Sequence, residues 1–172
     1  MIWVAAALGA IVGSFLNVVI HRYPREESIV FPPSRCPHCG THIKPYDNVP
    51  ILAWLWLRGR CRACREPITA RYPLVELANG LFYAAAFQRT GLTWGFIPIA
   101  ALVSMTIVLI YIDLDIQILP DVIDLPGVAI GLLIGYLHLG AQYPDLMLAK
   151  TLLESVAGAA AGAGVLLAIA LT

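Results

Sequence analysis

The sequence predicts an all-α polytopic membrane protein with about five transmembrane helices and a cytoplasmic four-cysteine zinc loop. The 172 residues are 59% hydrophobic and 13% charged, whereas soluble domains are about 45–50% apolar. Nine of the eleven basic residues lie between Arg22 and Arg71, where only four acidic residues oppose them, so this stretch carries a formal charge of +5. The composition argues against a cytosolic enzyme. A total formal charge of zero provides no basic field for nucleic acid.

Stretches long enough to cross a bilayer recur along the chain. A spanning helix needs about 20 apolar residues, within a range of about 17–25. Residues 92–112 are the clearest case because they contain no charge, whereas residues 72–88 are a short stretch that includes Glu76 and Asn79. The expected spans are residues 2–20, 72–88, 92–112, 125–143 and 155–172.

Charge placement predicts the orientation of these spans. No basic residue precedes the first span and no small-residue cleavage site follows it, so we expect it to remain as a helix rather than be removed as a signal peptide. The positive-inside rule places the +5 stretch in the cytoplasm. Counting spans forward, the N-terminus and residues 88–91 and 144–151 are external. Residues 113–121 and the C-terminus are cytoplasmic.

Four cysteines provide the sharpest local signal. They form two C-x2-C pairs separated by 21 residues, one more than the usual 15–20 of the four-cysteine zinc template. Four thiolates complete a closed tetrahedral site, which makes the zinc structural, and His38 and His42 are then expected to be solvated loop residues. Two disulfides are the competing interpretation, and a reducing cytoplasm favours the metal. The expected ligands are Cys36, Cys39, Cys61 and Cys64.

Carboxylates gather between the third and fourth expected spans, where ionisable groups at membrane depth are functional candidates. Asp121 follows Pro120, with Asp124 three residues later, a pattern typical of a helix start with acidic residues near its positive end. Asp115 has an equally simple interpretation as the solvated end of a helix. These three carboxylates therefore each have a structural explanation.

Asp113 differs because it directly follows the apolar run from Leu92, where desolvation favours a protonated carboxyl suited to acid and base catalysis. Aspartyl catalysis needs a second carboxyl close enough to share a proton. On a helix Asp115 points about 200° away from Asp113. Asp121 would be about 12 Å further along the axis, beyond the break at Pro120. The partner of Asp113 is therefore expected outside this cluster.

Four motifs, taken in order, resemble those of the type IV prepilin peptidase family, and the resemblance covers essentially the whole chain. They are the stretch Gly13–Arg22, the paired C-x2-C, the stretch Arg71–Glu76, and the stretch from Ile112-Asp113 to Leu119-Pro120-Asp121. Asn17, Arg22 and Glu76 are polar positions of these motifs. Arg22 either pairs with Glu76 near the cytoplasmic boundary or only follows the positive-inside rule.

The resemblance implies a multi-pass aspartyl endopeptidase of the bacterial inner membrane. Family members cleave the leader peptides of type IV prepilins and type II secretion pseudopilins at the cytoplasmic face, so these precursors and the lipid bilayer are the expected partners. Many members also methylate the new N-terminal amine with S-adenosylmethionine, for which the sequence identifies no binding residues. Asp113 matches the family's first catalytic aspartate.

The family's second catalytic aspartate lies in a Gly-x-Gly-Asp motif, which this sequence does not contain. We therefore expect a truncated chain that is inactive as a protease by itself. The expected division is a first transmembrane helix at residues 1–20, a cytoplasmic zinc-binding loop at 21–71 and an incomplete transmembrane aspartyl peptidase core at 72–172. A non-catalytic membrane adaptor with a zinc-stabilised loop is the alternative. A cation transporter is disfavoured because the carboxylates gather at one membrane boundary.

Overall fold

The computed structural model describes residues 1–117, 120–143 and 148–170, and the regular secondary structure of that part is helical, as the sequence predicted. Leu119 of the Asp113 motif, residues 144–147 of the expected external segment and residues 171–172 of the last expected span lie outside the described residues. The α-helices are α1 (Ile2–Arg22), α2 (Leu52–Trp56), α3 (Arg71–Thr90), α4 (Phe96–Ile116), α5 (Asp121–Tyr136), α6 (Leu139–Gln142) and α7 (Leu152–Ala170). Short 3-10 turns occur at Tyr23–Arg25 and Pro45–Asp47.

The expected spans coincide with helices, but these helices differ in how well they fit a bilayer. Among the described residues, Ile2–Arg25 and Phe96–Ile116 are long and apolar enough to cross a membrane. The fourth expected span begins earlier than predicted, at Asp121, and ends at Tyr136 because His138 adopts a left-handed conformation. At 16 residues α5 is shorter than the range of about 17–25. Two helices of the described part thus have the length and composition of membrane spans, and both membrane insertion and the count of five spans stay predictions.

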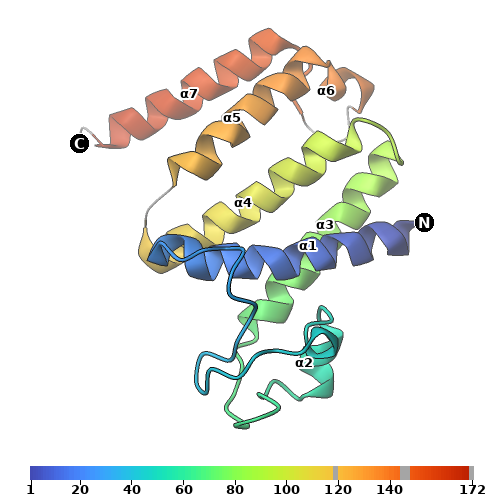
Figure 1. Ribbon diagram of the computed structural model, residues 1–172. Helices are drawn as coiled ribbons and strands as arrows, with labels where there is room; N and C mark the ends of the chain where they lie inside the picture. Colours follow the sequence, from blue (N-terminus) through green and yellow to red (C-terminus); the bar gives the residue numbers. More distant parts are fainter. Residues whose placement is uncertain (118–119, 144–147, 171–172) are drawn as a thin grey trace.

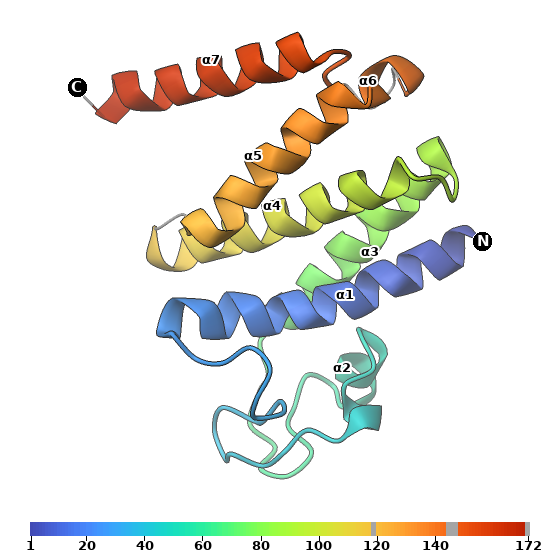
Figure 2. The same cartoon turned by 45° about the horizontal axis from the view of Figure 1, so that its top comes forward.

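The helices form a layered bundle with a polar module on one side. α1 and α3 pack against each other, α4 lies beside them, and α5 and α7 continue on the far side of α4 (Figures 1 and 2). Residues 23–70, here called the cysteine module, emerge from α1 and return into α3. The module therefore adjoins the two helices that carry the Gly13–Arg22 and Arg71–Glu76 motifs.

Glycines allow α1 and α3 to approach closely. A Cβ atom on Gly13 would lie 2.8 Å from the Cα atom of Glu76, and one on Gly9 would lie 2.7 Å from the Cβ atom of Tyr83. In lipid such small-residue faces let helix backbones pack in van der Waals contact. Only glycine fits at these two positions without displacing α3.

A polar network explains how α3 tolerates Asn79 inside an apolar bundle. The Asn79 side chain is fully buried and donates a hydrogen bond of 2.7 Å to the Gly9 carbonyl oxygen. Its own oxygen accepts a bond of 3.1 Å from the Ser104 hydroxyl, which also bonds Tyr83 at 3.0 Å. Since these bonds link α1, α3 and α4, the polar group that weakened the second expected span in the sequence is satisfied inside the bundle.

Replacing Gly13 with leucine is expected to destabilise the protein by about 1–3 kcal/mol or more, because the new side chain must push α3 away from α1. Thermal unfolding of the purified protein in detergent measures this loss. Gly158→Leu on α7 is the matched control, because no described atom lies within 4 Å of a Cβ atom there. Equal melting temperatures for the two variants would contradict the close α1–α3 contact.

Candidate functional site

The four cysteines form one cluster, as the sequence predicted. Their sulfur atoms all lie within 4.8 Å of one another, and the Sγ atoms of Cys36 and Cys64 are 3.8 Å apart. A tetrahedral zinc ion with bonds of about 2.3 Å to sulfur separates its ligand atoms by about 3.8 Å. The four cysteines are free thiols in the structure, and their arrangement is that of a possible metal site.

Two similar turns build this cluster. In the first, the Cys36 amide donates to the Thr41 carbonyl at 2.9 Å and the Gly40 amide donates to the Cys36 carbonyl at 2.9 Å. In the second, the Cys61 amide donates to the Glu66 carbonyl at 2.9 Å and the Arg65 amide donates to the Cys61 carbonyl at 3.1 Å. Each turn therefore presents both of its thiols on the same side.

Electrostatics favours a cation at this position. Hydrogen bonds with the side chain and backbone of Thr41 lower the pKa of the Cys39 thiol to about 6. The pKa of Cys64 is raised to about 12, because desolvation and the three neighbouring thiols outweigh a hydrogen bond with the Glu66 backbone that lowers it. Several thiolates this close repel one another, and a divalent cation removes that repulsion. The donor set thus fits a thiolate-bound metal such as zinc.

The two histidines of the first turn lie outside the sulfur cluster. His38 and His42 are both exposed, as expected for solvated loop residues. An ion pair stabilises the module further: the Arg62 Nε atom donates a bond of 2.7 Å to the Asp47 carboxylate. This guanidinium holds the pKa of Asp47 below its usual range. The pair connects the second cysteine turn to the 3-10 turn at Pro45–Asp47.

The four aspartates lie at the end of α4 and the start of α5, as the sequence predicted. Asp121 and Asp124 occupy the first turn of α5 and are exposed, which confirms the predicted helix start. Asp113 lies in the last turn of α4 with an exposed side chain. The desolvation expected for Asp113 is therefore not provided by the described residues.

Asp115 has a partner that sequence reasoning missed. One terminal nitrogen of Arg71 lies 2.8 Å from each Asp115 carboxylate oxygen, and the other donates to the Tyr111 carbonyl oxygen at 3.3 Å. The guanidinium also lies 4.9 Å from the centre of the Tyr111 ring. Arg71 is the first residue of α3, directly after the cysteine module, so it links the module to the turn that carries Asp113. In the sequence, Arg71 stands at the boundary between the polar module and the apolar stretch that follows. That position was the one feature that could have indicated its role.

The polar motif residues join the module to α1 and α3. The Asn17 side chain donates to the Tyr72 carbonyl oxygen at 3.0 Å, and the Glu76 carboxylate accepts a bond of 2.7 Å from the Ile51 amide. Arg22 instead donates to the Ser28 carbonyl oxygen at 2.9 Å. No Arg22–Glu76 ion pair forms among the described residues, which leaves the positive-inside interpretation for Arg22.

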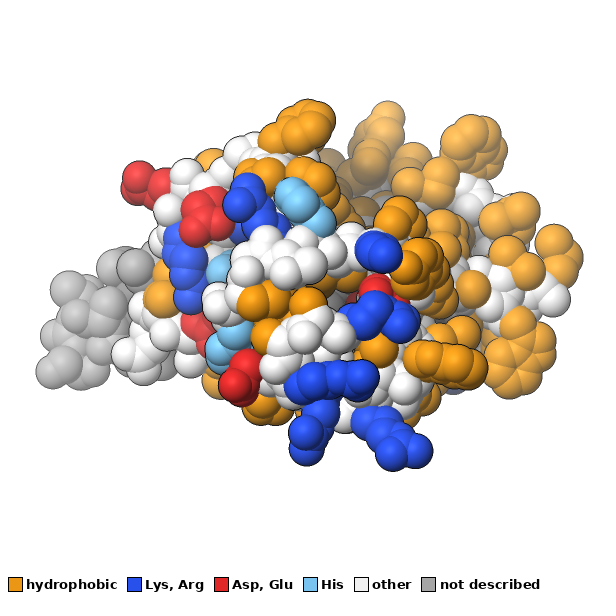
Figure 3. All heavy atoms as spheres, turned by 60° about the horizontal axis from the view of Figure 1, so that its bottom comes forward, with side chains coloured by type: hydrophobic (Ala, Val, Ile, Leu, Met, Phe, Trp, Pro, Cys, Tyr) orange, Lys and Arg blue, Asp and Glu red, His pale blue; other side chains and the backbone are white. Residues whose placement is uncertain are grey.

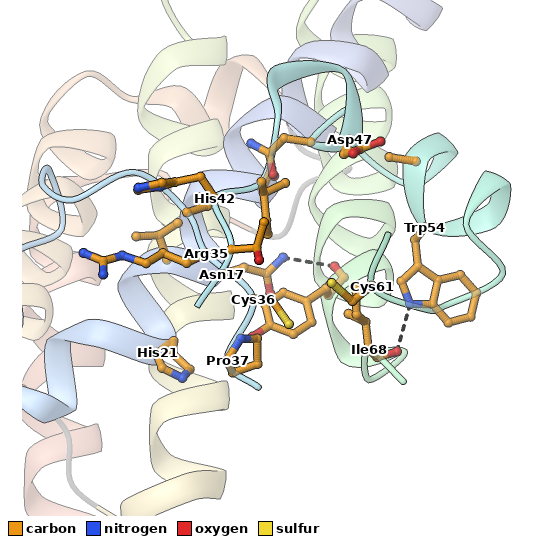
Figure 4. Close-up of a pocket in the computed structure, with 18 of the residues that line it drawn as sticks. Asn17, His21, Arg35, Cys36, Pro37, His42, Asp47, Trp54, Cys61 and Ile68 are labelled. Atoms are coloured by element: carbon orange, nitrogen blue, oxygen red, sulfur yellow. Dashed lines mark hydrogen bonds between the residues drawn. The ribbon is translucent and has the colours of Figure 1, made fainter. Parts of the chain in front are cut away.

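A cavity of about 1000 Å³ lies between the cysteine module and the ends of α1 and α3 (Figure 4). Its walls combine aromatic, charged and apolar side chains, including Trp54, Tyr72, Arg60 and Glu76. Asn17 and His21 of α1 face it from one side and Trp54 and Ile68 of the module from the other (Figure 4). Its volume is at the upper end of the 300–1,000 Å³ typical of small-molecule sites.

Comparison with known proteins identifies a matching family model and several similar proteins. Residues 7–90 match the family model described as Bacterial Peptidase A24 N-terminal domain. A prepilin leader peptidase/N-methyltransferase of Myxococcus xanthus (strain DK1622) is 50% identical over 129 residues, which cover 75% of this chain and 38% of that protein. Proteins with the same name from Aeromonas hydrophila and Stutzerimonas stutzeri are 41% and 39% identical, over 75% and 83% of this chain and 54% and 57% of their own lengths. The chain thus spans between 38% and 57% of the length of these three relatives. No solved structure matches it.

Proposed function

We propose, from the premise that this chain is a relative of the prepilin leader peptidase/N-methyltransferases, that it forms part of a membrane aspartyl endopeptidase. The substrates would be the leader peptides of type IV prepilins and pseudopilins, cleaved at the cytoplasmic face of the inner membrane. The observation that carries the proposal is the placement of Asp113 on the last turn of a membrane-length helix, linked through Asp115 and Arg71 to the cysteine module.

In the proposed reaction two carboxyl groups share one proton across the scissile peptide. One accepts a proton from the attacking water, and the other donates a proton to the leaving amine nitrogen. Asp113 is one of this pair. Asp115 is held by Arg71, and Asp121 and Asp124 occupy a helix start, so we assign the second carboxyl to the Gly-x-Gly-Asp motif of the family, which these 172 residues do not contain.

The cysteine module would position the substrate rather than take part in hydrolysis. Four thiolates fill the coordination shell of a zinc ion, so the ion has no open position for water. The module carries most of the +5 charge of residues 22–71, in the expected cytoplasm, where a leader segment would enter. Cleavage of a purified prepilin by the full-length protein and by its Asp113→Asn variant tests the assignment.

Orientation is the first testable part of the proposal. A reporter inserted within residues 45–55 is expected to behave as cytoplasmic, because it lies inside the positively charged module. A reporter at residues 144–150 is expected to behave as external. Paired cytoplasmic and periplasmic reporters at both positions measure this. A cytoplasmic signal at both positions would show that the second span was counted wrongly, and the opposite pattern at both would show an inverted orientation.

Methyl transfer to the new N-terminus is the second proposed activity, and the cavity beside the cysteine module favours it. S-adenosylmethionine would supply the methyl group. Arg60 and Cys61 line the cavity. We propose that the segment Gly59–Cys61 contributes to the methyl-transfer surface there. Equilibrium dialysis with labelled S-adenosylmethionine is expected to show binding by the intact chain and loss of binding in Cys36→Ser, which disrupts the cavity wall. Equal binding by both proteins would place the donor elsewhere.

A further inference from the structure

The short helix α2 (Leu52–Trp56) of the cysteine module presents an apolar face that the described residues do not cover. Leu52 is 65% exposed, Leu55 58% and Trp56 83%. The opposite side of α2 is held in place: the Trp54 indole N–H donates to the Ile68 carbonyl oxygen at 3.0 Å. The Trp54 ring also closes over Gly59, where a Cβ atom would lie 2.8 Å away. The exposed face is therefore a fixed surface rather than the side of a loose loop.

The contacts of Ile51 show which part of α1 lies level with the exposed face of α2. Ile51, the residue before α2, donates its amide to the Glu76 carboxylate at 2.7 Å. The Glu76 backbone in turn packs against Gly13 of α1. Gly13 lies nine residues before the end of α1 at Arg22, about 13 Å along the helix axis. α2 thus begins level with the apolar part of α1, not beyond its charged end.

Several arginines come soon after the exposed face of α2 in the sequence. Arg58, Arg60 and Arg65 are exposed, and the ion pairs found among the described residues include none of them, whereas Arg62 is paired with Asp47. Figure 3, viewed from the module side, shows Lys and Arg side chains gathered beside a hydrophobic surface. Aromatic and aliphatic side chains next to arginines match the acyl boundary and the anionic headgroups of a bilayer surface.

We infer that Leu52, Leu55 and Trp56 insert into the cytoplasmic surface of the bilayer, with Arg58 and Arg65 on anionic phospholipid headgroups. This interfacial anchor rests on the membrane insertion and orientation given in the proposed function. A five-residue helix is too short to span, so it lies in the interface. The anchor holds the four-cysteine cluster and the adjoining cavity against the membrane from which an apolar substrate segment emerges.

Tryptophan quenching by brominated phospholipids tests the anchor. The chain is placed in nanodiscs of phosphatidylcholine and phosphatidylglycerol, with Trp3 and Trp94 replaced by phenylalanine. These two side chains are 82% and 88% exposed, so their replacement disturbs no packing. The remaining tryptophans are Trp54 and Trp56, both on α2. Lipid brominated near the headgroup end of the acyl chain is expected to reduce their fluorescence about twofold.

The two tryptophans serve as matched variants. Trp56→Phe is expected to remove most of the quenching, whereas Trp54→Phe is expected to retain it, because Trp54 faces the module. Arg58→Glu together with Arg65→Glu should weaken the quenching in anionic nanodiscs. Arg35→Glu, which lies across the cavity from Trp54 (Figure 4), should not.

Quenching that survives Trp56→Phe, or that is absent in the parent, would overturn the anchor. Quenching that appears only at high protein-to-lipid ratio, together with cross-linked dimers, would show that a second copy covers the face, and would also overturn it. A chain that retains only Trp3 reports whether α1 is inserted at all. The assay needs no prepilin cleavage, so failure of the anchor is distinguishable from failure of the proposed peptidase activity.

Discussion

Exchange of Asp113 for asparagine in the full-length protein is expected to lower prepilin cleavage by a factor of about 100 to 10,000, the range typical of a lost acid–base group. An amide nearly preserves the side-chain volume but cannot accept a proton from water. Because Asp113 lies in the last turn of α4 and is not a member of the four-cysteine cluster, the metal content should not change. Single-turnover cleavage of a purified prepilin, with zinc determined on the same sample, measures both quantities.

The neighbouring aspartates provide the controls. Asp115→Asn and Asp124→Asn are expected to retain most of the activity, because Asp115 is engaged with Arg71 at an exposed surface and Asp124 lies at the start of α5. An exposed ion pair contributes only about 0–1 kcal/mol. The 172-residue chain by itself is expected to show no cleavage. Cleavage by this chain that disappears with Asp121→Asn would place the second aspartate within these residues. Full cleavage by the Asp113→Asn protein would remove the aspartyl mechanism as assigned.

Exchange of Cys36 for serine is the second change with a large expected effect. Cys36 is buried in the sulfur cluster, and the metal-binding free energy of such sites is about 10–16 kcal/mol in zinc-finger peptides. We expect the purified protein to contain about one zinc per chain. The variant should lose this metal and its module should become sensitive to protease, while α1, α3 and α4 retain their helical signal. Metal analysis and limited proteolysis in detergent measure these effects.

His38→Ala is the matched control for Cys36→Ser. It changes an exposed side chain in the same turn without removing a sulfur ligand, so the zinc content should be preserved. Acidification should release the metal from the parent protein, because protons compete for the thiolates. Two disulfides and no metal, seen by mass mapping under non-reducing conditions, would overturn both the metal site and the cytoplasmic placement of the module.

Local sequence patterns were sufficient to predict several structural features of this protein. The spacing of the two C-x2-C pairs predicted that four thiols meet, because a tight turn can present both of its cysteines to one ion. The apolar run from Leu92 predicted α4, and the Pro120-Asp121 sequence predicted the start of α5. Such features are readable because their causes, hydrophobic length and turn chemistry, act within a few residues.

Contacts between distant segments were decided by the tertiary structure. Arg71 and Asp115 are 44 residues apart, and their pairing depends on how α3 crosses α4, which no local pattern encodes. The same holds for Arg22, which either pairs with Glu76 or only follows the positive-inside rule: the Glu76 carboxylate accepts a hydrogen bond from the Ile51 amide, and Arg22 donates to the Ser28 carbonyl oxygen instead. The sequence predicted the main helices, the meeting of the four cysteines and the position of Asp113 at the end of the apolar run, whereas the role of the cysteines as metal ligands stays a prediction. Only the packing of α1 on α3 decided where the cysteine module rests, because a long polar loop has many possible positions until specific hydrogen bonds and glycine contacts select one.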